Sequence, residues 1–456
     1  MASLRLNSPL VQNFLASVIV CLLPGIYVAL TVLGAGGGPA NATRMANISN
    51  TTLYAVYFVV GLFSGSVVTT IGPRNTFLFG SIGYPIFVGA MWYFSKTGHI
   101  WYPVFGGVVL GVTAAHLWTA AGFIAFSYAT EQKKGTFISM QWGLLSAGGT
   151  IASLVAFGIN YNAAVVKCPD SVYIVFIILM CSAFFVALFG IVKPADVRRD
   201  DGTAIAHYPH KGFWLEIKAQ RQIFMDWRML VLILPMFGSE NAIIIFSTLN
   251  SLYFDVRTRS LNSVMFVAMQ AVGALGIMPL LDSPKIGSRR TRGLVSTTTM
   301  GLVTIATWIG LLVWLDRNPL DPLSPPLWGW DDGPFGGFFA LTLLLGINMV
   351  YQVVVQWIIA ALTNDPETLA RYAGFAKGCL AGGLCVTFAT EAAGTLTQTD
   401  VTAFCFSLQG AGLVCMLAVC WFGVKHTNYG LEDAVIVPET VELDKKNDSG
   451  RCVTPQ

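Results

Sequence analysis

One ionisable residue stands in the middle of a long apolar stretch, where a lipid bilayer should not accept a charge. Glu240 lies within the apolar run of residues 229–253, between Ser239 and Asn241. A charge at the bilayer centre costs roughly 2.5 to 3.5 kcal/mol on insertion scales, so such a residue marks a functional site by default. Burial favours the neutral acid, which can take up and release a proton as its exposure changes. Glu240 is therefore a candidate proton-coupling residue; the alternative is a hydrogen-bonded Glu that only joins helices.

Further polar side chains fall inside other apolar runs. His116 lies midway along 101–128, and Gln141 lies within 136–161. Asn348, Gln352 and Gln356 recur every four residues, which places them on one face of a helix. We expect a translocation cavity lined by His116, Gln141, Glu240, Asn348 and Gln352. The structural alternatives are an interior histidine with satisfied hydrogen bonds and polar contacts between helices.

Two more charges lie in the run of residues 370–394. Lys377 is near its beginning, close enough to a membrane surface for its ammonium group to snorkel to water. Glu391 lies several helical turns further on, so the two side chains cannot pair directly. We expect Lys377 to snorkel and Glu391 to be an entrance residue or an interfacial one.

The elements that must position these residues are membrane helices. Of the 456 residues, 54% are hydrophobic and only 11% are charged, against roughly 25% charged residues in soluble domains. Runs of about 18 or more apolar residues are long enough to cross a bilayer as helices and too long for barrel strands. We find twelve such runs, at 10–34, 53–72, 76–95, 101–128, 136–161, 172–192, 229–253, 262–281, 293–315, 336–362, 370–394 and 402–424.

The longest polar segment between runs divides the chain in two. Residues 193–228 separate an N-terminal half of six helices, 1–192, from a C-terminal half of six helices, 229–424. The acidic tail 425–456 is expected to be disordered. We therefore predict an all-α polytopic membrane protein of twelve transmembrane helices in two six-helix halves. This is the architecture of the major facilitators, whose site lies between the halves near the bilayer midplane.

The basic residues predict the orientation. Most of the 27 Lys and Arg residues fall on the connections that share a side with 193–228, and cytoplasmic loops retain positive charge. Both termini should therefore be cytoplasmic, in a plasma membrane or an endomembrane. Asn41, Asn47 and Asn50 begin Asn-x-Ser/Thr sequons in the first outer connection, so they are candidate N-glycosylation sites, although sequons also arise by chance.

Several function classes are not indicated. The chain has no zinc-type His-Glu-x-x-His, no nucleophile elbow and no phosphate loop, so we expect no enzymatic activity. Its nine cysteines have no metal-binding spacing, so we expect neither a metal nor a cofactor. A net charge of +3 does not point to nucleic acid.

The turn between the second and third runs resembles the short signature loop of major facilitators. Gly65, Gly72, Pro73 and Arg74 carry that resemblance, while threonines replace the usual acid and base. The glycines let backbones approach closely, and Arg74 can bond carbonyls at a helix end. The alternative is a tight turn with one retained arginine.

Several stretches together resemble one branch of these proteins, the uncoordinated-ninety-three-like family, and its fungal members above all. The resemblance rests on Pro24-Gly25, the glycine run 33–38, Gly80, Gly83-Tyr84, Leu117-Trp118-Thr119, Ser127-Tyr128, Gly135, Trp142, Val197-Arg198, Asp201-Gly202, Arg257-Thr258-Arg259, Gln356-Trp357, Ala361-Leu362-Thr363-Asn364 and Tyr372-Ala373-Gly374. The chain departs from the family at Gly346-Ile347-Asn348-Met349, where related members tend to carry an acid, and at Cys379-Leu380-Ala381-Gly382.

The resemblance implies a fold more firmly than an activity, because some members of this family resemble transporters while others regulate potassium channels or escort receptors. Our first hypothesis is a carrier that moves a small solute or ion by alternating access, with Glu240 coupling protons. The alternative is a regulator or escort that does not transport and binds another membrane protein such as an ion channel. The partners expected are the lipid bilayer, the solute or ion, and such a membrane protein.

Overall fold

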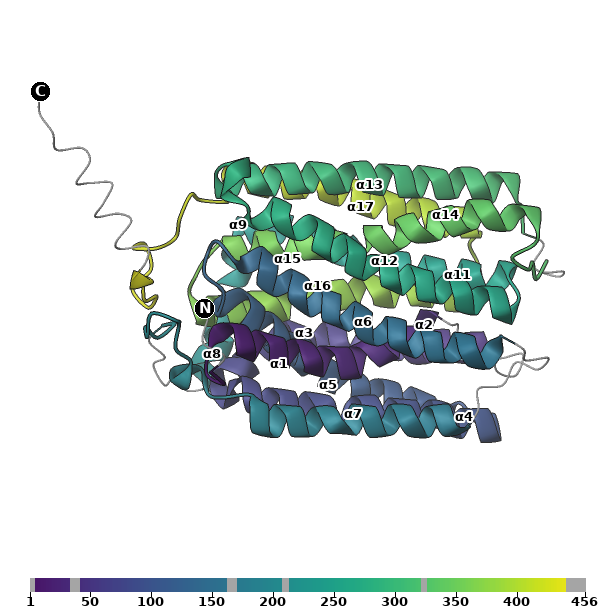
Figure 1. Cartoon of the computed structure of the whole chain (residues 1–456), viewed down its shortest axis with the longest axis horizontal. Coiled ribbons are helices and arrows are strands. Elements are labelled where there is room, and N and C mark those ends of the chain that lie inside the picture. Colours follow the sequence, from purple (N-terminus) through teal and green to yellow (C-terminus); the bar gives the residue numbers. More distant parts are fainter. Residues whose placement is uncertain (1–4, 33–41, 162–169, 207–212, 321–325, 440–456) are drawn as a thin grey trace, which may run out of the picture.

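The protein is a bundle of long, roughly parallel helices (Figure 1). The computed structural model describes residues 5–32, 42–161, 170–206, 213–320 and 326–439. The described residues begin and end at the same end of the bundle, here called the termini face, and the other end is called the opposite face (Figure 1). The early helices and the late helices form two groups that lie side by side along the bundle, with α3, α6 and α16 near their boundary.

The N-terminal half holds the first group of helices. A first crossing is built from α1, a short π-helix with Pro24 inside it, and α2, because proline removes a backbone donor and disturbs the α-helical ladder. The elements of this half are α1 (Pro9–Val20), η1 (Cys21–Gly25), α2 (Ile26–Val32), α3 (Ala42–Ser81), α4 (Gly83–Thr97), α5 (Trp101–Ser127), α6 (Lys134–Asn160) and α7 (Asp170–Gly190).

The linker and the C-terminal half follow. The linker carries η2 (Pro194–Asp196), α8 (Phe213–Gln220) and η3 (Ile223–Met225). The C-terminal half is built from α9 (Trp227–Val231), α10 (Ile233–Gly238), α11 (Ala242–Tyr253), α12 (Val256–Asp282), η4 (Pro284–Ile286), α13 (Arg289–Arg317), α14 (Gly333–Asn348), α15 (Tyr351–Ala361), α16 (Pro366–Ala393) and α17 (Gln398–Phe422).

The predicted architecture is confirmed. Eleven helical stretches of the described residues are long and apolar enough to cross a membrane. One of them, residues 44–97, has 54 residues, far more than the roughly 20 that one crossing needs. It holds two crossings, since the chain reverses inside it at Gly72. The twelve predicted runs therefore correspond to twelve crossings in two halves.

Gly72 makes that reversal possible. Its backbone has φ 80° and ψ 160° inside α3, a left-handed conformation that is costly for any residue with a Cβ atom. An added Cβ atom would meet no neighbour within 4 Å, so the backbone conformation, not space, favours glycine here. Pro73 follows and begins the next helix with a fixed φ.

Glycines also hold the two halves together along α3 and α16. A Cβ atom built on Gly65 would lie 2.6 Å from the Ala370 oxygen and the Arg371 Cα atom, and one on Gly374 would lie 2.7 Å from the Gly65 nitrogen. One on Gly61 would lie 2.8 Å from the Gly378 Cα atom. The two helix backbones therefore touch, which is the packing that small residues permit in membrane helices.

The prediction of a disordered tail is wrong for its first part. Residues 425–439 pack against the termini face, where Asn428 and Tyr429 are buried. Residues 440–456 lie outside the described residues. Hydrogen bonds from polar side chains fix this part of the tail to the bundle, and hydropathy does not reveal such contacts.

Candidate functional site

Glu240 lies at a break between two short helices of the seventh crossing. α10 ends at Gly238 and α11 begins at Ala242. Around the break the backbone changes to i to i−3 hydrogen bonds, from Ser239 N to Met236 O at 3.3 Å and from Ile243 N to Glu240 O at 3.1 Å. Interrupted membrane helices are tolerated where they line a cavity or are buried in protein. Glu240 therefore stands at an irregular point of the bundle.

Lys377 of α16 is the cationic partner of Glu240. The Lys377 Nζ atom lies 3.8 Å from the Glu240 Oε1 atom, and the two side chains are only 6% and 15% exposed. The expectation that Lys377 snorkels to a membrane surface is wrong, because the side chain points into the bundle. The buried carboxylate partly compensates the ammonium group for the water that it loses on burial.

Two more helices complete the surroundings of Lys377. Its Nζ atom donates to Gln352 Oε1 at 3.2 Å, and the Gln356 amide donates to the same oxygen at 3.0 Å. The ammonium group also lies 4.1 Å from the centroid of the Trp118 ring, a favourable cation–π geometry. Trp118 belongs to the N-terminal half, so the charged group of Lys377 lies where the two halves meet.

A pocket adjoins this cluster on the side of the termini face. Its cavity volume is about 20 Å³, which is room for about one water molecule. Its lining joins Gly122 and Phe126 of the N-terminal half to Ser239, Gln352, Gln356 and Lys377 of the C-terminal half. This space beside the buried ion pair is a place where a water molecule could enter.

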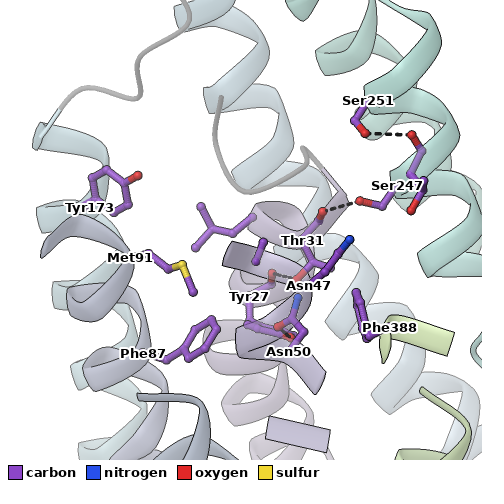
Figure 2. A pocket seen from close by; sticks show the side chains of 13 residues that line it. Tyr27, Thr31, Asn47, Asn50, Phe87, Met91, Tyr173, Ser247, Ser251 and Phe388 are labelled. Carbon is purple, nitrogen blue, oxygen red and sulfur yellow. Dashed lines mark hydrogen bonds between the residues drawn. The ribbon is translucent and has the colours of Figure 1, made fainter. Parts of the chain in front are cut away.

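A second pocket lies between the halves at the opposite face (Figure 2). It is larger than the first but still small, with a cavity volume of about 40 Å³. The N-terminal half supplies Tyr27, Thr31, Asn47 and Asn50, and the C-terminal half supplies Ser247, Ser251 and Phe388. Ser247 donates to the Thr31 carbonyl at 2.8 Å across the pocket (Figure 2). We call this the outer pocket.

Aromatic side chains from both halves line the outer pocket, and further aromatic rings pack behind them. Phe388 stacks on Tyr54 with ring centroids 5.6 Å apart and an interplanar angle of 8°, and Tyr54 stacks in turn on Tyr57. Tyr27 contacts Phe87 edge to face at 5.6 Å and donates its hydroxyl to Asn50 Oδ1 at 2.9 Å. The pocket lining thus offers flat apolar faces beside a few fixed polar groups.

The structure does not bring His116 or Gln141 to either pocket. His116 Nδ1 bonds the Val112 carbonyl of its own helix at 2.8 Å, and its ring packs edge to face on Phe79 at 5.2 Å. Gln141 donates to Asn13 Oδ1 and to the Ala121 carbonyl, both at 2.9 Å. Both side chains are buried within the N-terminal half, where they serve packing and hydrogen bonding.

Asn348 also lies away from Gln352. It donates to Gln409 Oε1 at 2.9 Å and accepts from Thr304 at 2.9 Å, inside the C-terminal half. α14 ends at Asn348 and α15 begins at Tyr351, and the Val350 N–H donates to Ile347, three residues back. This tighter turn rotates the next helix, so the spacing of four no longer puts Asn348 and Gln352 on one face.

The sequon residues occupy different environments. Asn41 lies outside the described residues. Asn47 is half-buried and lines the outer pocket, whereas Asn50 is buried and bonded to Tyr27. Glycosylation at these positions stays a prediction.

Two glycines of the signature loop have clear structural roles. Gly65 lies in the close contact between α3 and α16, and Gly72 lies where the chain reverses. Pro73 is buried, and Arg74 makes no hydrogen bond or ion pair within the part of the chain that the structure describes. The predicted bonding of Arg74 to helix-end carbonyls is therefore not seen there.

Contacts between the halves close the bundle at the termini face. Asp282, at the end of α12, accepts from the backbone N–H groups of Gly135 at 2.8 Å and Thr136 at 2.5 Å, which are first-turn donors of α6 in the other half. The Lys134 ammonium donates to the Ala360 and Thr363 carbonyls at 2.5 and 3.0 Å. Free N–H groups at a helix beginning attract a carboxylate.

Glu131 is a second bridge at this face. Its Oε1 atom accepts from Arg289 at 2.7 Å and from the Asn364 amide at 2.7 Å, both in the C-terminal half. The Glu131 and Arg289 side chains are 4% and 3% exposed. These contacts could not be predicted from the sequence, because nothing in a loop sequence says which other loop it contacts. The residues concerned all fall between predicted apolar runs: Glu131, Lys134, Asp282 and Arg289.

Comparison with known proteins agrees with this architecture. The family described as "Ion channel regulatory protein UNC-93" matches residues 44–239. An uncharacterised membrane protein of Schizosaccharomyces pombe is 41% identical over 386 residues, which cover 84% of this chain and 78% of that protein. UNC93-like protein 1 of Arabidopsis thaliana is 31% identical over 432 residues, covering 93% and 92%.

Among solved structures, the fold is similar to two proton symporters of the major facilitator superfamily. The proton:xylose symporter XylE aligns with a TM-score of 0.60 and 12% identity, over 91% of this chain and 94% of that one. The Escherichia coli fucose:proton symporter FucP aligns with a TM-score of 0.57 and 12% identity, over 90% and 99%. Fold and family are thus of the membrane carrier or regulator type, and the chain belongs to the UNC93-like family with a major-facilitator fold.

Proposed function

We propose that the protein is a secondary carrier that works by alternating access of its two halves. The observation that carries the proposal is an asymmetry between the two faces. Among the described residues, the outer pocket separates the halves at the opposite face, where one hydrogen bond from Ser247 to Thr31 crosses it. At the termini face, Glu131, Asp282 and Lys134 join the halves by several hydrogen bonds. This is the arrangement expected of one end state of a rocking carrier.

The basic residues support an orientation of the bundle in the membrane. The termini face carries most of the Lys and Arg residues, so the termini face would be cytoplasmic and the outer pocket would face outward or into a lumen. The membrane itself would be a plasma membrane or an endomembrane.

The lining of the outer pocket favours an uncharged solute. Apart from tyrosine, the thirteen side chains around it include no acid, lysine, arginine or histidine. A bare ion would lose its water without gaining a counter-charge, which costs several kcal/mol. Once the pocket widens beyond its present cavity of about 40 Å³, a neutral organic molecule with both hydrogen-bonding groups and an apolar face could use Asn47, Ser251 and the ring of Phe388.

Glu240 and Lys377 would supply the coupling to protons. In the present state the two charges attract one another across 3.8 Å. Protonation of Glu240 would remove that attraction and free Lys377 to interact with Gln352 and Trp118 alone. A proton could thereby change the contacts between the halves, since Trp118 belongs to the other half.

The test is flux in proteoliposomes that contain a pH-sensitive dye. A panel of uncharged sugars, amides and aromatic alcohols is added outside, and solute-dependent acidification is recorded for the native protein and for Glu240→Gln. Acidification that a panel member triggers, and that Glu240→Gln abolishes while solute exchange continues, supports coupled transport. The same pH dependence in Glu240→Gln would remove the coupling role, and no flux of any member would count against transport.

A regulatory role is the second candidate, and the family description favours it. The matched family is described as an ion channel regulatory protein. Such a protein would keep the fold and bind a second membrane protein. Purification of a stoichiometric complex with one membrane protein, together with absence of flux, would favour this role over transport.

A further inference from the structure

The segment of residues 425–439 makes specific contacts with the C-terminal half at the termini face. The carboxylate of Glu432 accepts from the Thr363 hydroxyl at 2.6 Å and from the Asn364 backbone N–H at 2.8 Å. The Asn428 amide donates to the Ala361 carbonyl at 3.1 Å. These acceptors and donors belong to the end of α15 and the turn before α16.

The same segment contacts the N-terminal half. The Asn428 backbone N–H donates to Glu131 Oε1 at 2.7 Å, the oxygen that also receives Arg289. The Tyr429 hydroxyl accepts from the Glu131 backbone N–H at 3.4 Å. Burial raises the pKa of Tyr429 to about 12, so its phenol stays neutral at physiological pH.

The linker between the halves holds the far end of the segment. Val435 forms an isolated antiparallel bridge with Ala206, and the Arg199 guanidinium donates to the Ile436 carbonyl at 2.9 Å. Arg199 is buried although it carries a charge. The segment is thus fixed at three places: on the C-terminal half, on the N-terminal half and on the linker.

We propose that residues 425–439 form a strap that locks the two halves together at the termini face. Opening of this face requires Glu131 to move away from Arg289 and Asn364, and the strap is bonded to both sides of that division. The strap must therefore release from at least one half before the face opens. This inference rests on the proposed alternating access, and it assigns the strap as the element that regulates it.

The charge at Glu432 offers a precise way to weaken the strap. Glu432→Gln removes a charged acceptor of two hydrogen bonds. Asp433→Asn makes the same change of charge at an exposed neighbour that has no hydrogen bond or ion pair to the described part of the chain. Hydrogen bonds to charged groups contribute more than neutral ones, so only the first change should loosen the strap. Truncation after residue 424 is the complete removal.

The opening is measured by electron paramagnetic resonance distances in nanodiscs, without a solute. Spin labels are placed at Lys193→Cys, the first linker residue after α7 of the N-terminal half, and at Lys285→Cys, between α12 and α13 of the C-terminal half. Both positions are exposed, and the nine native cysteines are replaced in this background. We expect a longer-distance population in Glu432→Gln and a larger one after truncation. Asp433→Asn should match the parent. Identical distributions in all four proteins would overturn the strap.

A reversible cross-link gives a second measurement that does not depend on a weakened variant. Residues paired across an antiparallel bridge have Cα atoms about 4.5 to 5.5 Å apart, which suits a disulfide. For this measurement the two spin labels are carried by non-natural amino acids at positions 193 and 285, so that cysteine chemistry leaves them unchanged. Ala206→Cys with Val435→Cys should then abolish any longer-distance population when oxidised, and reduction should restore it. A longer population that persists under oxidation would contradict the lock. Because neither experiment uses flux, a strap that responds in a protein without transport would refute only the carrier.

Discussion

Lys377 Nζ lies 3.8 Å from Glu240 Oε1, in the interior of the bundle and on two helices of the same half. Trp118 of the other half covers the ammonium group at 4.1 Å. The only two charged side chains of this central region are therefore paired, as far as the described residues extend. Each charge compensates for the burial of the other. Because Lys377 also contacts Trp118, a movement of one half relative to the other would change the surroundings of the pair.

Loss of one partner should be more harmful than loss of both. Lys377→Met leaves a buried carboxylate without its cation and should lower the free energy of unfolding by on the order of 3 kcal/mol. Combining it with Glu240→Gln should recover part of that loss, because no uncompensated charge remains. Thermal unfolding of the two single variants and the double variant in nanodiscs gives the coupling. Purely additive shifts would mean that the pair does not interact.

We call the close contact between the glycines of α3 and α16 the glycine seam. One added methyl group in this seam should strongly destabilise the protein. Gly65→Ala would place a Cβ atom 2.6 Å from the Arg371 Cα atom, so the two helices must move apart. We expect a lower thermal midpoint and weaker closure of the termini face. Gly89→Ala in α4 is the matched control, because nothing lies within 4 Å of its Cβ position. A control as harmful as Gly65→Ala would refute the seam.

Asn348 should matter for stability and not for solute choice. Asn348→Leu leaves the buried Thr304 hydroxyl without its acceptor and removes one donor from Gln409 Oε1, and an unpaired buried group costs about 1 to 3 kcal/mol. Trp308 still donates to Gln409, so the network should be weakened without collapsing. Thermal unfolding and solute competition are measured together. If Asn348→Leu changed the solute preference and left stability unchanged, Asn348 would contribute to the solute site after all.

The sequence predicted the crossings and the halves because hydropathy is a local property. It failed at Asn348 and Gln352 because their shared face assumed one continuous helix, and the turn at Val350 breaks that assumption. It failed at Lys377 for a different reason. The partner, Glu240, lies far away in the sequence, and only the packing of α16 against the broken seventh crossing brings them together.

The closed termini face was beyond sequence reasoning on similar grounds. Glu131, Asp282 and Glu432 all lie outside the predicted apolar runs, where charged side chains are usually solvated. Each nevertheless accepts two or more hydrogen bonds in the folded chain. Apolar periodicity predicts which residues face the bundle interior, but it carries no signal about which polar loops meet. The strap in particular comes from a tail whose composition favours disorder.

Asp226, just before α9, supplies a prediction about pH. Burial tends to raise the pKa of this carboxyl, but hydrogen bonds from Arg228 and Tyr372 outweigh burial and hold the pKa below its usual value. Arg228 donates to both carboxylate oxygens, with Nε to Oδ1 at 2.8 Å and Nη2 to Oδ2 at 2.6 Å. The Tyr372 hydroxyl also donates to this carboxylate.

Because the pKa is lower in the folded state than in the unfolded state, ionised Asp226 stabilises the fold at neutral pH. The contribution is complete above the unfolded pKa of about 3.9 and is lost as the pH falls through the lower folded value. Asp226→Asn should therefore lower the thermal midpoint by a constant amount from pH 7 to pH 5, with the difference from the native protein shrinking below pH 4. A difference that stays constant down to pH 3 would show that the amide fails for steric reasons, and that ionisation of Asp226 does not stabilise the fold.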